Sequence, residues 1–170
     1  MILGMSTSTF TWVHVVLSLI GIFSGAVVLF GMFSAKRLNG WTALFLATTV
    51  LTGVTGFFFH SVSFGPPHVV GVISLVVLAV AILALYVYSL TGSWRWIYVA
   101  GAVAALYFNV FVGVVQAFQK LPFLKPLAPT QSEPPFLAAQ FVVLAIFVVL
   151  GVVAVRSFHP ETKVPASISV

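Results

Sequence analysis

Five long apolar runs constrain the fold of this chain more than any other feature. They cover residues 12–33, 41–59, 67–90, 96–118 and 135–155. Each is close to the ~20 residues that a helix needs to cross the ~30 Å hydrocarbon core of a bilayer. The hydrocarbon core leaves backbone groups no water to bond, and no run alternates as a barrel strand does. We therefore expect an all-α integral membrane protein with five transmembrane helices, or four if the last run lies in the interface.

These helices are predicted to form a single bundle, residues 1–155, followed by a short cytoplasmic tail, residues 156–170. Composition agrees, because 61% of the residues are hydrophobic and 5% are charged, far from soluble proteins, in which roughly a quarter are charged. The net charge of +5 comes from basic residues scattered between the runs, so it predicts no nucleic-acid partner. The absence of cysteine excludes disulfides, thiolate metal sites and c-type haem attachment.

The distribution of lysine and arginine predicts the orientation of the bundle. The first and third links and the tail carry five basic residues, namely Lys36, Arg37, Arg95, Arg156 and Lys163. The alternate segments carry only Lys120 and Lys125. Since cytoplasmic segments are enriched in basic residues, we expect the N-terminus outside and the C-terminus in the cytoplasm. No basic residue precedes the first run, which is also longer than a signal-peptide core, so we expect it to be retained.

Polar side chains are predicted to gather at the outer surface of the bundle. His14, His60, His68 and Gln116 each lie about 28–30 Å from the cytoplasmic end of their helices, given a rise of ~1.5 Å per residue. Glu133 and Gln140 are placed to complete this set. We call the six residues the polar layer: His14, His60, His68, Gln116, Glu133 and Gln140.

Residues spaced by three or four share a helix face, and small residues continue from His14 through Gly21 and Gly25. Such stripes let helices pack closely in lipid. A similar stripe in the fourth run contains Asn109, the most deeply placed polar group, about 20 Å from Trp96. We expect Asn109 to act as an interhelical hydrogen-bond anchor.

The polar layer admits several functions. His14, His60 and His68 could bind a divalent metal, and a pair of them could hold haem b, although their spacing matches no standard motif. A small-solute carrier would need a polar path past Asn109. The favoured interpretation is that these side chains pack and hydrogen-bond, with no cofactor, in a non-catalytic accessory, sensing or scaffold protein. Its partners would be the bilayer and a membrane protein or a second copy.

The connection over residues 119–134, QKLPFLKPLAPTQSEP, contains four prolines and several apolar residues. We expect it to lie against the membrane surface or to form a lid.

Residues 92–140, GSWRWIYVAGAVAALYFNVFVGVVQAFQKLPFLKPLAPTQSEPPFLAAQ, resemble small bacterial inner-membrane proteins of unassigned function. The resemblance implies a multi-pass protein of the bacterial cytoplasmic membrane, and it implies no activity or residue role.

Overall fold

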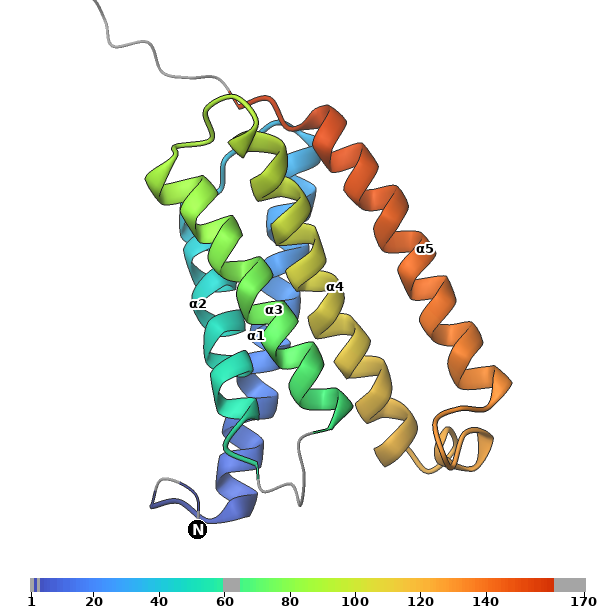
Figure 1. Ribbon diagram of the computed structural model, residues 1–170. Helices are drawn as coiled ribbons and strands as arrows, with labels where there is room; N and C mark the ends of the chain where they lie inside the picture. The colour runs from blue at the N-terminus through green and yellow to red at the C-terminus, as the bar shows by residue number, and fades with distance from the viewer. Residues whose placement is uncertain (1, 3, 60–64, 161–170) are drawn as a thin grey trace, which may run out of the picture.

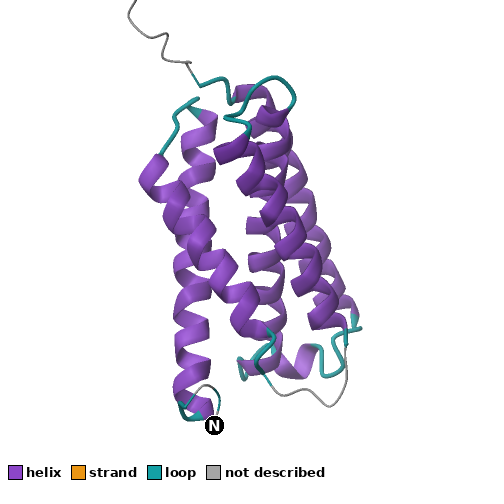
Figure 2. Cartoon of the chain, turned by 60° about the vertical axis from the view of Figure 1, so that its left-hand side comes forward, coloured by secondary structure: helices purple, strands orange, loops and turns teal. Residues whose placement is uncertain are grey.

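The computed structural model describes residues 2, 4–59 and 65–160 of the chain. These residues form α1 (Thr7–Phe33), α2 (Asn39–Gly56), α3 (Pro66–Ile82), α4 (Trp94–Lys120) and α5 (Pro134–Ser157). A π-helical turn, η1 (Leu83–Val87), extends α3, and a 3-10 turn, η2 (Lys125–Leu127), follows α4. The predicted all-helical bundle is confirmed for this part of the chain (Figure 2). His60, Lys163 and most of the predicted tail lie outside the described residues.

Among the described residues, four helical segments are long and apolar enough to cross a membrane: Thr7–Phe33, His68–Val87, Trp94–Lys120 and Pro134–Ser157. The sequence predicts that the last run is the one that lies in the interface if only four helices cross the membrane. In the structure, however, that run is a 24-residue apolar helix. The weaker segment is α2, which has 18 residues and begins with the polar Asn39. At ~1.5 Å per residue α2 is about 27 Å long, slightly short of the ~30 Å core.

Successive helices run in alternating directions, as the colours of Figure 1 show. One end of the bundle, which we call the loop end, contains residues 4–10 and the connection 121–133. The opposite end, which we call the arginine end, contains residues 34–38, 88–95 and 156–160. His14 and His68 lie near the loop end, each within eight residues of the first residue of its helix.

The hydrophobic core lies among α1, α2, α3 and α4 and includes Val28, Phe45, Leu78 and Leu106. The predicted small-residue stripe of α1 faces this core. A Cβ atom on Gly25 would come within 2.7 Å of Leu106 Cδ1 and 2.8 Å of Phe45 Cε2. Glycine therefore sets how closely α1 approaches α2 and α4.

Helix α5 packs along α4 at the edge of the bundle (Figure 1). Its only buried residues are Phe136, Gln140 and Ala154. At the loop end Phe136 packs edge-on against Phe118 with ring centroids 5.4 Å apart. At the arginine end Phe158, just beyond the helix, is buried and lies 6.0 Å from the ring of Tyr98. Aromatic contacts thus hold α5 at its two ends.

Candidate functional site

His14 of the polar layer joins α1 to α2. Its Nδ1 lies 2.8 Å from the hydroxyl oxygen of Thr55. The single hydroxyl proton of Thr55 is donated to the carbonyl of Leu51, at 2.7 Å, so the hydroxyl oxygen accepts from His14 Nδ1–H. The imidazole also packs edge-on against Phe59, with centroids 5.1 Å apart. Only Nε2 of His14 is left for a ligand.

His68 belongs to the start of α3. Its Nδ1 accepts a hydrogen bond of 3.2 Å from the backbone N–H of Gly65, which is the back-bonding half of a capping box. Its ring lies 5.9 Å from that of Phe57. His14 and His68 therefore both contact the last turn of α2 or the residues after it.

The part of the chain that the structure describes contains no group of three or more histidine and acidic side chains that could hold a metal ion. The predicted metal site is therefore not formed by these residues. His60, the third predicted ligand, is not among the described residues. The metal and haem b hypotheses for His14, His60 and His68 therefore stay predictions.

Gln116 does not join the polar layer, because it is exposed on the surface of α4. The small-residue stripe of α4 continues in steps of four from Gly113 to Ala117. Gln116 lies three residues from Gly113, at the edge of that face. Its side chain is nevertheless exposed.

Gln140 joins α5 to α4 and is 8% exposed. Its Nε2 donates to the carbonyl of Phe111 at 3.2 Å. Its Oε1 is buried and has no hydrogen-bond partner among the described residues. The Gln140 amide therefore links α5 to α4 and does not take part in a histidine cluster.

Glu133 is the residue before α5, and its carboxylate is bound by the preceding loop rather than by the helix. Its carboxylate accepts hydrogen bonds from the backbone N–H and the hydroxyl of Thr130, at 3.0 and 2.8 Å, and from the backbone N–H of Ser132, at 3.1 Å. Loss of hydration would raise the pKa of this carboxyl, but these hydrogen bonds outweigh it and hold the pKa below its ordinary value. Among the described residues, the donors to this carboxylate are the backbone and the threonine hydroxyl rather than Lys120 or Lys125.

Asn109 forms the interhelical hydrogen bond predicted for it. Its Nδ2 donates from α4 to the hydroxyl oxygen of Thr49 in α2, at 3.1 Å. Gly21 of α1 lies against the same pair, because a Cβ atom there would be 3.3 Å from Asn109 Nδ2 and from Thr49 Oγ1. Three helices thus meet at this contact. Towards the arginine end the buried side chains of Phe45 and Leu106 follow, so the polar path that a carrier requires does not continue through them.

Arg95 has a structural role that the sequence did not reveal. Its Nη1 donates to the carbonyls of Val155, at 3.1 Å, and of Phe158, at 2.6 Å. These carbonyls lie at the C-terminal end of α5, where a cation is favourably placed. From the sequence, Arg95 indicates only the cytoplasmic side of the bundle. Its hydrogen bonds to residues some sixty positions away leave no local pattern in the sequence.

Comparisons with protein-family models, with curated proteins and with solved structures gave no match to this chain.

Proposed function

We propose that this chain is a multi-span membrane protein with its N-terminus outside and its C-terminus in the cytoplasm. We further propose a non-catalytic role as an accessory, sensing or scaffold component of the bacterial cytoplasmic membrane. The bacterial location follows from the resemblance of residues 92–140 alone.

One observation carries the non-catalytic role: polar side chains, both inside the bundle and at its two ends, bond to neighbouring helices. His14 bonds from α1 to α2, Asn109 from α4 to α2, Gln140 from α5 to α4 and Arg95 from α4 to the end of α5. In lipid such bonds hold helices together, since an unpaired polar group would be costly there. This use of the side chains supports a role in packing over a role in chemistry.

Charge supports the orientation. Among the described residues the arginine end carries Lys36, Arg37, Arg95 and Arg156, whereas the loop end carries Lys120 and Lys125. Basic residues mark the cytoplasmic side, so the arginine end would face the cytoplasm.

The outer loop is the proposed contact surface for a partner or a second copy. Ala128 is buried with Phe118 and Phe136, which fixes the loop on the ends of α4 and α5. Phe123, by contrast, is 70% exposed. A loop that is fixed in place and presents a large aromatic side chain is better suited to protein contact than to opening and closing as a lid.

An absorption spectrum and an elemental analysis of the detergent-purified protein test the non-catalytic role against the redox alternative. We expect no Soret band and no stoichiometric copper or zinc, both in the wild type and in His14→Ala. A Soret band or stoichiometric metal that is lost in His14→Ala, and kept in the exposed control Gln116→Ala, would replace our proposal with a redox function.

Photo-crosslinking in native membranes tests the contact surface. A photoreactive residue at Phe123 should give a discrete protein adduct. The same group at Phe141, which is 68% exposed in the middle of α5, should not give that adduct. No protein adduct at position 123, or equal adducts at both positions, would contradict the proposed surface.

A further inference from the structure

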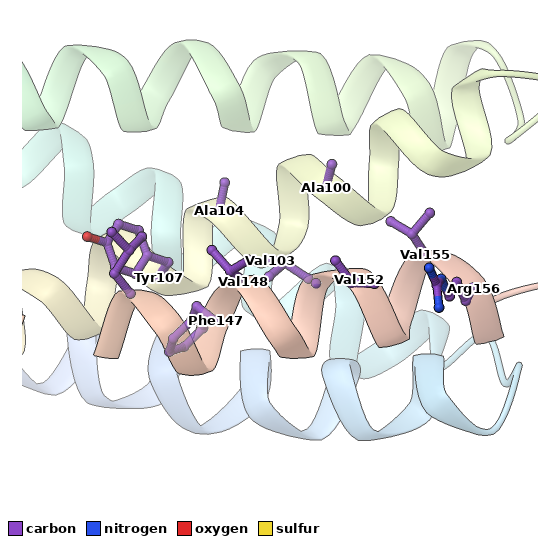
Figure 3. Close-up of a pocket in the computed structure, with 11 residues that line it drawn as sticks. Ala100, Val103, Ala104, Tyr107, Phe147, Val148, Val152, Val155 and Arg156 are labelled. Atoms are coloured by element: carbon purple, nitrogen blue, oxygen red, sulfur yellow. The ribbon is translucent and has the colours of Figure 1, made fainter. Parts of the chain in front are cut away.

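A cleft of about 400 Å³ lies between α4 and α5. Its walls combine small residues, with Ala100 and Ala104 on α4 and Gly151 on α5, with larger apolar side chains such as Val103 and Val152. Tyr107 lies at one end and Arg156 at the other (Figure 3). Along α5 the cleft runs from the contact of Phe147 with Tyr107, whose ring centroids are 5.7 Å apart, towards the arginine end, where Phe158 contacts Tyr98.

The length of the cleft matches one leaflet of a bilayer. From Leu144 to Arg156 the lining of α5 extends over twelve steps of ~1.5 Å, or about 18 Å of helix. Half of the ~30 Å hydrocarbon core is about 15 Å. The cleft therefore has the length of one acyl chain that starts at the membrane surface beside Arg156.

Arg156 supplies a charge at the surface end of this apolar cleft. It is exposed and lies in the last turn of α5. Unlike Arg95, it makes no hydrogen bond or ion pair with the residues that the structure describes. A guanidinium group binds phosphate oxygens well, and basic pockets between helices on the cytoplasmic side of membranes bind anionic headgroups.

We propose that the cleft between α4 and α5 binds an anionic phospholipid of the cytoplasmic leaflet, with one acyl chain between the helices and its phosphate on Arg156. This inference rests on the membrane insertion and orientation proposed above. Charge favours a phospholipid over a helix from a second copy, because the exposed Arg156 at the surface end of the cleft matches a phosphate.

Native mass spectrometry of the protein in mild detergent tests this proposal with two probes, phosphatidylglycerol and phosphatidylcholine with identical acyl chains. We expect one phosphatidylglycerol to bind about fivefold more tightly than phosphatidylcholine, since one basic residue near a membrane surface changes affinity by about that factor. Arg156→Gln should lose this preference. The control Arg37→Gln removes an exposed arginine at the same end but outside the cleft, so it should keep the preference.

A second pair of variants tests the cleft itself. A Cβ atom on Gly151 would lie 3.5 Å from Val103 Cγ1, which is an ordinary contact, so Gly151→Leu should fill the cleft without a clash at the backbone. Gly151→Leu should weaken the binding of both lipids. The control Ala145→Leu adds a similar side chain on an exposed position of α5 outside the cleft and should not.

Equal binding of the two lipids by the wild type would overturn the proposal. The same loss of preference in Arg156→Gln and Arg37→Gln would also overturn it, and this arm does not depend on how well Gly151→Leu folds. Failure of membrane insertion is a separate result: the wild type would then be released from membranes by an alkaline carbonate wash, whatever lipid it binds in detergent.

Discussion

Arg95→Met should detach the C-terminal end of α5 from the bundle. The substitution keeps an apolar side chain of similar length but removes both hydrogen bonds, at 3.1 Å to Val155 O and 2.6 Å to Phe158 O. The buried ring of Phe158 is then held in place only by packing against Tyr98 and its other neighbours. Helix α5 has few other buried residues to compensate for the loss.

The size of the effect follows from these two bonds. A hydrogen bond from a charged donor contributes about 1.5–3 kcal/mol. Arg95 is only partly buried, and the carbonyls at a helix end can be hydrated once it is gone, so we expect the lower part of that range. A decrease of about 2 kcal/mol in the free energy of unfolding corresponds to roughly a 30-fold change in the unfolding equilibrium.

Tryptophan fluorescence during an SDS titration in mixed micelles measures this change. Trp94 stacks on Tyr88 with centroids 3.8 Å apart, so the probe lies next to the substituted position. Arg95→Lys should lose about half as much stability, because Nη1 alone donates to both carbonyls and a lysine ammonium can replace it as a donor, but the shorter side chain does not reach the same position. The control Arg37→Met removes an exposed arginine at the same end and should change little. The proposed role is refuted if Arg95→Met and Arg37→Met unfold at the same SDS concentration.

Three further predictions concern the interior and the loop end. Asn109→Ala should lower the free energy of unfolding by about 1 kcal/mol, as for other interhelical hydrogen bonds in membranes, measured by the same titration. Gly25→Ala should cost about 1–3 kcal/mol, because its Cβ would come within 2.7 Å of a core side chain; Gly40→Ala, with nothing within 4 Å of its Cβ, should be neutral or stabilising. Acidification below pH 4.5, the ordinary pKa of glutamate, should reduce the protection of the Thr130 amide, measured as its hydrogen-exchange rate relative to the intrinsic rate of an unprotected amide at the same pH. The folded-state pKa of Glu133 is lowered, so its contribution to stability is full above pH 4.5 and is lost as the pH falls through the folded-state pKa.

Each of these three predictions has a contrary outcome. Wild-type stability in Asn109→Ala would mean that its hydrogen bond does not stabilise the bundle. Equal effects of Gly25→Ala and Gly40→Ala would contradict close packing at Gly25. An equal loss of protection at Thr130 in wild type and in Glu133→Gln on acidification would show that the carboxylate is not responsible.

Helix positions and helix faces could be predicted from this sequence because both follow from local pattern. Apolar length gave the helices, and the spacing of small residues correctly placed Gly21 and Gly25 against neighbouring helices. Asn109 could be recognised as an anchor because an amide that deep in an apolar helix needs a partner. Its partner, Thr49, could not be named, since periodicity identifies a face but not the helix opposite it.

The polar layer was predicted less well, because depth alone does not decide what a side chain contacts. His14 and Gln140 do reach other helices, but their partners are a threonine hydroxyl and a backbone carbonyl rather than each other. Gln116 is exposed on the surface of α4, although it lies only three residues from Gly113 of the small-residue stripe. Arg95 was missed because its acceptors are backbone carbonyls, which every residue provides and no sequence pattern marks.

Cysteine labelling in intact cells tests most directly whether the helices cross the membrane as proposed. The chain has no cysteine, so single cysteines can be introduced at Ser34, Ser93 and Ser132, which are all exposed. If α2 crosses the membrane with the other helices, Ser34→Cys and Ser93→Cys react only after permeabilisation, and Ser132→Cys reacts from outside with an impermeant maleimide. Labelling of Ser34→Cys and Ser93→Cys from opposite sides would show that α2 does not cross and would contradict the proposed topology.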